Sequence, residues 1–241
     1  MEVFANENGE IRFKDGCPLS EAPKTSQFFC ITNSFGNALS HYFNYRNGAK
    51  LSLHTVYMIG LKILELLEII HEAGYVHNDI SLRKVVLGYE KQLQFDYLGS
   101  ANKTIKPQPF HFMDLSFATP YIDFETGRHL KKGKVNCPIN ISNEMQTLRR
   151  LNYERTSRKD DLEMLCSLLI TLCNHYCLPD FKTLHQSKDM SNEQYLTLLK
   201  CYKESYSLSL MCKYTNNKDH ALNNLCQQVE ALSFTSKPDY Q

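Results

Sequence analysis

The residues best suited to chemistry lie in one short segment that follows a long apolar run. The segment begins His77-Asn78-Asp79 and continues to Lys84, and a further acidic residue, Asp114, follows a later apolar run. A carboxylate in such a loop can accept a proton from a hydroxyl group or coordinate a divalent cation through oxygen. The alternative is a structural role, in which both Asp side chains accept hydrogen bonds from backbone groups or buried donors.

Four segments, taken in order, resemble the C-terminal half of protein kinases, most closely the casein kinase 1 and vaccinia-related kinase group. Residues 61–77 are similar to the helix and entry of the catalytic loop, and residues 35–39 resemble the segment just after the hinge. Residues 157–163 resemble the start of the central helix, and residues 232–240 resemble a Lys-Pro-Asp-Tyr motif of casein kinase 1. The resemblance covers about residues 28–241. It implies a mainly α (α+β) fold that corresponds to the C-terminal lobe of a kinase.

The same resemblance implies a division of the chain. We expect residues 1–27 to be an irregular remnant of the N-terminal lobe, and residues 28–241 to form the kinase-like lobe. No Gly-x-Gly-x-x-Gly occurs, and the space before the hinge is too short for a five-stranded lobe, so a vestigial or absent N-terminal lobe is expected. The parts of the kinase-like lobe are the hinge at about 30–36, the catalytic-loop equivalent at 77–85, an insert at 90–110 and the activation-segment equivalent at 114–150.

Four side chains take their expected roles from the resemblance. Asp79 matches the catalytic-loop Asp that accepts the hydroxyl proton, and Asp114 matches the Asp that binds metal in the Asp-Phe-Gly motif. Asp161 matches the Asp that holds the catalytic-loop backbone from the central helix, which is a structural role. His77 is expected to be a packed, hydrogen-bonded core residue.

Five other positions depart from the pattern of the family. Ser81 replaces a Lys that contacts the γ-phosphate, and Lys84 replaces an Asn that binds the second metal ion. This second change replaces an oxygen ligand with an ammonium group, which only donates hydrogen bonds and cannot coordinate Mg²⁺. Asn78 replaces an Arg, and Leu115-Ser116 replaces the rest of the Asp-Phe-Gly motif. The sequence therefore predicts a degenerate site.

Two functions compete on this evidence. The first is a catalytically inactive pseudokinase, a scaffold or interaction subunit that needs no cofactor and whose protein partners cover the face left open by the missing lobe. The alternative is an active Ser/Thr kinase of casein kinase 1 type, which would use ATP and Mg²⁺ with Asp79 as catalytic residue and Asp114 as metal ligand. A third function, nucleic-acid binding through the basic run 128–134, is disfavoured because the run lacks interleaved aromatic residues and the net charge is +1.

Composition excludes several other classes. Of the 241 residues, 42% are hydrophobic and 22% are charged, which is typical of a globular protein. The apolar stretch at 56–70 contains Lys62, Glu65 and Glu68, so it is too charged and too short to span a membrane. The nine cysteines form no C-x-x-C motif, and residues 1–16 do not resemble a secretion signal. We therefore expect reduced thiols and a cytoplasmic or nuclear protein.

The elements that position these residues are predicted mainly from apolar periodicity. A helix that is buried around most of its circumference is expected over 51–73, capped by Ser52 and ended by Gly74. A second helix is expected over 157–173, with Ser157 as N-cap. Shorter elements are expected as a hairpin across Asn8-Gly9, a β-rich run at 28–32, a break at 34–37, a helix at 38–46, strands near 85–89 and 111–113, and amphipathic helices at 192–210 and 218–232.

Overall fold

The computed structural model describes residues 3–5, 11–13, 35–43, 51–88, 110–136, 139–140, 143–181, 190–215 and 220–240. The chain divides into two units, Met1–Phe35 and Gly36–Gln241. In the first unit, β1 (Val3–Ala5) pairs antiparallel with β2 (Ile11–Phe13), which supplies the two strands of the hairpin predicted around Asn8-Gly9. The β-rich run at 28–32 and nearly all of the predicted hinge and insert lie outside the described residues.

The second unit mixes helices and short strands, as expected for a kinase-like domain. Its strands form two small sheets, one in the order β3-β5-β6 and one in which β4 pairs with β7. The strands are β3 (Phe35–Ala38), β4 (Tyr75–Val76), β5 (Val85–Gly88), β6 (Phe110–Phe112) and β7 (Thr119–Pro120). The helices are α1 (Leu39–Tyr42), α2 (Leu53–Glu72), α3 (Leu148–Leu151), α4 (Arg158–Cys173), α6 (Asn192–Ser205), α7 (Leu208–Tyr214) and α8 (His220–Ala231).

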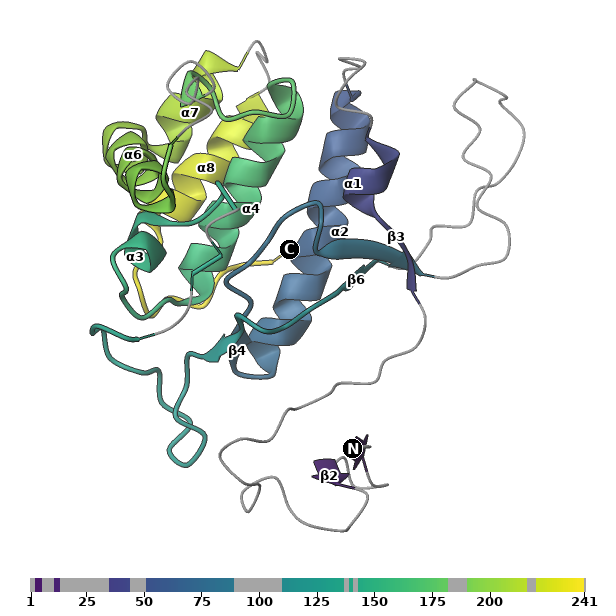
Figure 1. The fold of residues 1–241 in the computed structure, drawn as a ribbon, viewed down its shortest axis with the longest axis vertical. Coiled ribbons are helices and arrows are strands. Elements are labelled where there is room, and N and C mark those ends of the chain that lie inside the picture. The colour runs from purple at the N-terminus through teal and green to yellow at the C-terminus, as the bar shows by residue number, and fades with distance from the viewer. Residues whose placement is uncertain are drawn as a thin grey trace. The chain divides into compact units, whose positions relative to one another are not determined.

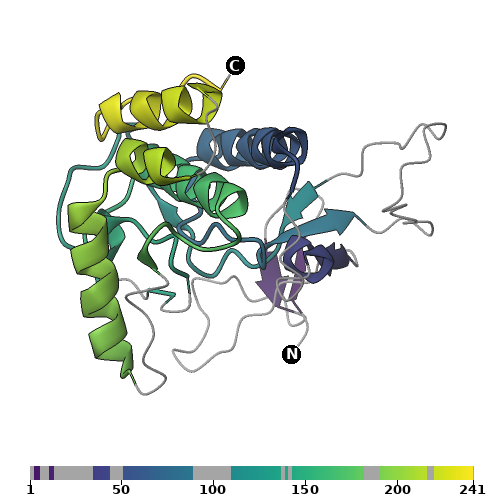
Figure 2. The ribbon, with the colours of Figure 1, turned by 90° about the horizontal axis from the view of Figure 1, so that it is seen from above.

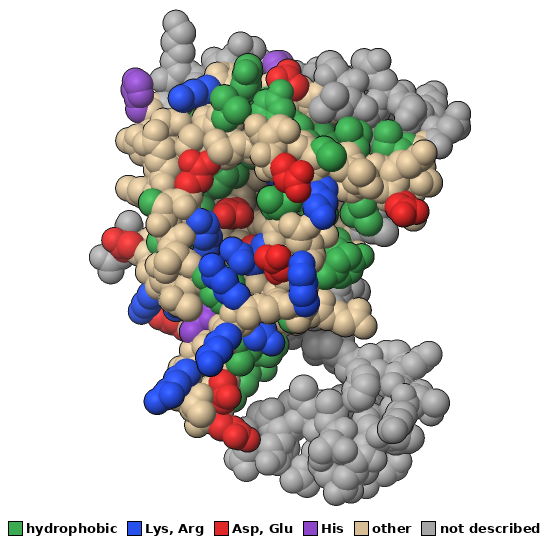
Figure 3. Space-filling view, turned by 90° about the vertical axis from the view of Figure 1, so that its left-hand side faces the viewer, with side chains coloured by type: hydrophobic (Ala, Val, Ile, Leu, Met, Phe, Trp, Pro, Cys, Tyr) green, Lys and Arg blue, Asp and Glu red, His purple; other side chains and the backbone are tan. Residues whose placement is uncertain are grey.

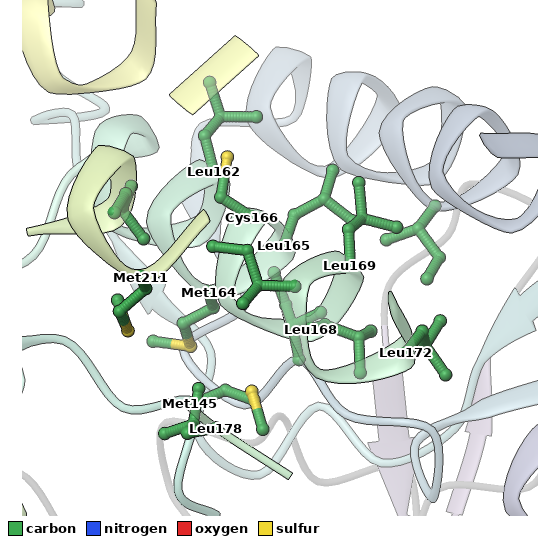
Figure 4. Packing of buried hydrophobic residues seen from close by; sticks show 14 of the residues in the cluster. Met145, Leu162, Met164, Leu165, Cys166, Leu168, Leu169, Leu172, Leu178 and Met211 are labelled. Atoms are coloured by element: carbon green, nitrogen blue, oxygen red, sulfur yellow. The ribbon is translucent and has the colours of Figure 1, made fainter. Parts of the chain in front are cut away.

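Helix α4 lies at the centre of the hydrophobic core. Its start is fixed by a capping box, in which the backbone N–H of Ser157 donates to Asp160 Oδ2 at 2.8 Å. From Leu162 to Leu172 almost every residue is buried, because α2 packs on one side and α8 on the other. In Figure 1, α4 (green) lies between α2 (blue) and α8 (yellow), and Figure 2 shows α2 and α8 both above α4. Figure 4 shows Leu and Met side chains of α4, such as Leu165 and Met164, together with Met145, Leu178 and Met211 from other parts of the chain.

Helix α2 matches its predicted bounds but not its predicted burial. Ser52 Oγ accepts a hydrogen bond from the Thr55 N–H at 3.1 Å, and Gly74 follows the helix with φ +88°, a value that suits glycine. Val56 and the residues in line with it are buried against α4, but Leu61 is 55% exposed and Ile69 is 64% exposed. The prediction of burial around most of the circumference was wrong, because no described element covers the outer face of this helix.

Two shorter elements also differ from expectation. The break expected at 34–37 is strand β3, which pairs with β5. A Cβ on Gly36 would lie 3.0 Å from the carbonyl oxygen of Leu87, so this glycine permits the close approach of the two strands. The helix expected over 192–210 is interrupted because Ser207 starts a new helix by accepting a hydrogen bond from the Leu210 N–H. Within the described segments, no helix has the combined length and apolar character needed to cross a bilayer.

Candidate functional site

The pairing of β5 with β6 brings the two parts of the candidate site together. Val85 lies opposite Phe112, so the residue before β5 and the residues after β6 meet at the same edge of the sheet. The backbone confirms this arrangement, since the Met113 N–H donates to the Lys84 carbonyl oxygen at 2.8 Å. Lys84 and Asp114 are therefore neighbours although 30 positions separate them.

The ammonium group of Lys84 lies between two carboxylates. Its Nζ forms an ion pair with Asp114 and lies 3.5 Å from Asp79 Oδ2. Asp114 also accepts hydrogen bonds from the hydroxyl and the backbone N–H of Ser116. The Lys84 and Ser116 hydrogen bonds lower the pKa of Asp114 to about 2. Burial by itself would lower the pKa of Lys84, but its contacts with Asp114 and Asp79 outweigh burial and raise it, so the group stays charged.

The carboxylate of Asp79 is buried and already hydrogen-bonded. Asn140 Nδ2 donates to both of its oxygens at 3.0 Å, and Asn143 Nδ2 donates to Oδ1 at 2.7 Å. Both amides come from the activation-segment equivalent. The sequence did not point to either Asn, because that stretch has no periodic pattern and their partner lies more than sixty positions earlier.

Asp161 joins the central helix to the backbone of the catalytic-loop equivalent. It is buried and accepts hydrogen bonds from the N–H of His77 at 2.6 Å and the N–H of Asn78 at 2.8 Å. Its Oδ2 is also 2.9 Å from His71 Nε2, and His71 Nδ1 is 2.6 Å from the Tyr240 hydroxyl. Burial by itself would raise the pKa of Asp161, but the hydrogen bond and charge of His71 hold it below its usual value. Sequence reasoning did not identify His71 or its contact with Tyr240.

His77 is a packed residue of the interior. Its Nδ1 accepts a hydrogen bond from the Asp79 N–H at 3.2 Å, and its ring lies 4.3 Å from that of Phe112, centroid to centroid. Burial lowers the pKa of His77 despite the nearby carboxylates of Asp161 and Asp79. Because the His77 Nδ1 accepts the Asp79 N–H, the ring helps to fix the conformation of the loop.

Asn78 lies where related kinases have an Arg, and it connects two segments without a charge. Its Nδ2 donates to the carbonyl oxygen of Phe117 at 2.9 Å and to Thr119 Oγ1 at 2.8 Å. The residue has φ +64°, a left-handed conformation that Asn tolerates better than most side chains. Asn78 therefore attaches the loop to the segment that contains Phe117 and Thr119 by hydrogen bonds between uncharged groups.

Ser81 and Leu115 do not join the group around Lys84. Leu115 is 55% exposed, and its carbonyl oxygen accepts the Ala118 N–H in a turn. Ser81 lines a cavity of about 430 Å³ that adjoins the site through Asn143, which donates to Asp79. The other residues around this cavity are Ser40, Leu82, Arg83, Asn143, Glu144, Met145, Leu168, Thr171 and Tyr176.

The basic run at 128–134 is partly engaged in holding the chain together. Lys134 Nζ donates to the Asn152 carbonyl oxygen at 2.9 Å and to Glu154 at 3.2 Å. Arg155 donates to the carbonyl oxygen of Lys131 at 2.6 Å. Figure 3 shows that the face rich in Lys and Arg side chains also carries Asp and Glu. This mixture gives no support to a nucleic-acid interface.

The side chains at the sheet edge fit a nucleotide–metal complex poorly. A divalent cation needs carboxylate oxygens that are free to coordinate, whereas Asp114 is paired with Lys84 and Asp79 is occupied by two amides. An ammonium at this position would also repel the cation. Among the described residues, no cluster of three or more His, Cys, Asp or Glu side chains is arranged to hold a metal ion.

Comparison with known proteins places the chain near casein-kinase-1-type kinases. Over 186 residues it is 26% identical to an Encephalitozoon cuniculi protein described as "Probable casein kinase I homolog", covering 76% of this chain and 50% of that protein. Over 63 residues it is 32% identical to "Nucleosomal histone kinase 1" of Drosophila melanogaster, covering 26% of this chain and 10% of that protein. No family model matches the chain. The similarity supports a kinase-like relationship, and the chain spans no more than half the length of these two relatives.

Proposed function

We propose that this protein is a catalytically inactive, kinase-like interaction subunit. The observation that carries the proposal is the position of the Lys84 ammonium, which contacts Asp114 and lies 3.5 Å from Asp79. These are the two carboxylates that a related kinase would use for the metal ion and for the substrate hydroxyl. The positive charge of Lys84 balances one of the two negative charges and lies where a divalent cation would bind, so neither ATP nor Mg²⁺ is expected to be a cofactor.

A second group of contacts supports the same proposal. Phosphoryl transfer needs a carboxylate that is free to accept a hydrogen bond from the substrate hydroxyl. Asp79 is buried, and Asn140 and Asn143 already donate three hydrogen bonds to it. A substrate hydroxyl would have to compete with these amides and with the nearby ammonium of Lys84 for the oxygens of Asp79. The loop therefore has the properties of a structural element, and Asp161 fixes it by accepting hydrogen bonds from the backbone of His77 and Asn78.

The alternative is an active Ser/Thr kinase of casein kinase 1 type that transfers the γ-phosphate of ATP to protein. The observation in its favour is that Asp79 and Asp114 lie in one site and share a contact with Lys84. The two named relatives are described as kinases, which also favours this activity. The alternative requires Lys84 to leave both carboxylates when a metal–nucleotide complex binds.

The proposed interaction role rests on exposed apolar side chains. Met113 and Leu115 are exposed directly beside the candidate site, next to each other in the segment that carries Asp114. Apolar side chains that cluster on a surface commonly mark protein–protein contacts. We propose that a protein partner covers the face beside Met113 and Leu115.

The catalytic part of the proposal is tested by calorimetric titration with Mn²⁺ and with ATP, with and without Mg²⁺. Lys84→Asn removes the ammonium and supplies an oxygen ligand, so we expect Mn²⁺ to bind at least tenfold more tightly than to the unmodified protein. The control, Lys134→Asn, removes an exposed lysine distant in sequence from both carboxylates and should leave Mn²⁺ binding unchanged. Tight Mg²⁺-dependent ATP binding by the unmodified protein, with phosphotransfer lost in Asp79→Asn, would instead establish the alternative.

The interaction part is tested on the isolated chain by sedimentation velocity and by binding of an apolar fluorescent dye. We expect self-association or dye binding that is reduced at least twofold in a Met113→Ser, Leu115→Ser double variant. The matched control, Met58→Ser with Ile69→Ser, changes the outer face of α2 instead. A stable, monodisperse monomer that binds no dye would reject the requirement for a partner.

A further inference from the structure

Two aromatic side chains are exposed next to each other beyond the C-terminal end of α2. Tyr75 is 40% exposed and Phe124 is 58% exposed, and their ring centroids lie 5.3 Å apart with the ring planes tilted by 43°. They come from different segments, since Tyr75 begins β4 and Phe124 follows β7. Aromatic residues are enriched where proteins bind other molecules, so this aromatic pair is a candidate contact surface.

The surrounding backbone holds the aromatic pair in place. Strand β4, which begins with Tyr75, pairs antiparallel with β7. A Cβ on Gly74 would lie 2.9 Å from Phe124 Cε1, so the absence of a side chain at Gly74 makes room for this ring. The turn that carries Phe124 is closed by the Gly127 N–H, which donates to the carbonyl oxygen of Asp123 at 2.7 Å. Figure 1 shows this turn as the narrow teal loop below β4.

The residues beside the two rings are mainly acidic. Asp123 and Glu125 adjoin one ring along the chain, and Glu72, at the end of α2, lies three positions before the other. Glu72 and Glu125 are exposed. Hydrogen bonds from the backbone N–H groups of Thr126 and Glu125 hold the pKa of Asp123 below its usual range, so this carboxylate stays charged. Three carboxylates thus outnumber Arg128, the cation of the same turn.

Two other aromatic rings of the second unit already hold cations from the chain itself. The guanidinium carbon of Arg158 lies 4.7 Å from the ring centroid of Tyr121, and that of Arg149 lies 4.9 Å from the ring centroid of Phe234. Among the described residues, no lysine or arginine takes such a position over the exposed aromatic pair. The pair can therefore accept a cation from another molecule, because a ring face attracts positive charge.

We propose that this aromatic and acidic surface binds an arginine-containing basic segment of a protein partner. A guanidinium group can stack on a ring and at the same time donate hydrogen bonds to a neighbouring carboxylate, whereas the compact ammonium of lysine stacks poorly. Nucleic acids and anionic membranes would be repelled by the three carboxylates. The inference does not rest on the absence of catalysis, because it involves none of the residues around Lys84.

The proposal is tested by fluorescence anisotropy, in which the full chain is added to a labelled peptide of alternating arginine and glycine. We expect saturable binding that is at least threefold tighter than the binding of a matched lysine–glycine peptide, because the guanidinium group stacks on the rings. A glutamate–glycine peptide should not bind. Absence of saturable binding by the arginine peptide, or equal binding of the arginine and lysine peptides, would overturn the proposal.

Matched variants locate the binding. Phe124→Ser removes an exposed ring and Glu125→Lys reverses an exposed charge beside it, so each should weaken binding of the arginine peptide at least threefold. The controls, Tyr214→Ser and Glu193→Lys, make the same changes at exposed positions of α7 and α6. Circular dichroism checks that each variant is folded, and Glu125→Lys decides the location if Phe124→Ser is not. Equal weakening in the variants and their controls, or binding of single-stranded RNA or phosphatidylserine vesicles in place of the peptide, would refute the proposal.

Discussion

At the residue scale, a few polar contacts decide what the kinase-like loop can do. Lys84 lies between the two carboxylates at the sheet edge, and the buried Asp161 fixes the loop from the side of α4. The first contact bears on catalysis and the second on architecture. The two can be separated by mutation, because Lys84 and Asp161 share no hydrogen-bond partner among the contacts described above.

The role of Asp161 leads to a stability prediction. Asp161→Asn removes a buried charge that accepts hydrogen bonds from His71 and from the backbone of His77 and Asn78. Leaving such donors unsatisfied costs about 3 kcal/mol of unfolding free energy, which urea denaturation followed by circular dichroism would measure. Glu72→Gln, at an exposed position near the end of α2, should cost less than about 0.5 kcal/mol. Equal losses in the two variants would contradict the assigned role.

At the element scale, the turn after α2 determines where the loop begins. Gly74 has φ +88°, and its backbone groups bond on both sides, with its N–H donating to His71 and its carbonyl oxygen accepting the Tyr121 N–H at 3.1 Å. A Cβ added at Gly74 would lie 2.6 Å from Ile122 Cδ1. The glycine is therefore required for two reasons, the backbone conformation and the packing of the segment after β7.

The two reasons can be distinguished with a second glycine. Gly74→Ala should cost about 2–3 kcal/mol, since strain in the backbone and a steric clash add. Gly127 also has a positive φ, +65°, but a Cβ there would meet no atom within 4 Å, so Gly127→Ala should cost only about 1 kcal/mol. Thermal or urea unfolding of both variants measures the difference. If both alanines cost the same, packing at Gly74 contributes nothing.

At the scale of the whole molecule, the helical core contains ionisable groups that make its stability depend on pH. On α4, burial and the nearby Asp160 raise the pKa of Glu163 to about 7, against the influence of Lys159, Arg149 and Lys203. On α6, burial lowers the pKa of Lys203 to about 8, and its Nζ donates to Ser167 Oγ at 3.2 Å. Both shifts disfavour the charged forms near neutral pH.

The shift of Glu163 predicts a direction. Because its folded pKa is raised above the ordinary value of 4.5, the folded state holds the proton more tightly, and stability falls as pH rises from about 4.5 to about 7. Over this pH range the free energy of unfolding of Glu163→Gln should fall by about 1–2 kcal/mol less than that of the unmodified protein. The difference is this small because the Glu163 side chain is 29% exposed and partly screened by solvent. Urea denaturation at pH 4.5 and pH 7.5 provides the comparison. Glu193→Gln, an exposed control, should keep the original pH dependence.

The sequence by itself determined the parts of this protein whose physics is local. Helices α2 and α4 were predictable because caps such as Ser52 and Ser157 bond to residues within the same turn, and apolar residues repeat every three or four positions. The order of the kinase-like segments could also be predicted from the sequence, and the resemblance predicted Lys84 where related kinases have a metal ligand. The sequence did not predict that the helix expected over 192–210 is two helices. The apolar periodicity continues across this stretch, but Ser207 caps a new helix.

Only the tertiary structure decided which distant groups meet. The pairing of β5 with β6 brings Lys84 to Asp114, and the packing of α4 brings Asp161 under the loop. The amides that contact Asp79, and the apolar cavity lined by residues of α2, α4 and α8, likewise come from segments far apart in the chain. Such contacts depend on how whole helices and strands pack against each other. That packing is the sum of many weak interactions, which a local pattern of residues does not predict. For this reason the residue types predicted a degenerate site, while the structure alone showed the ammonium of Lys84 between its two carboxylates.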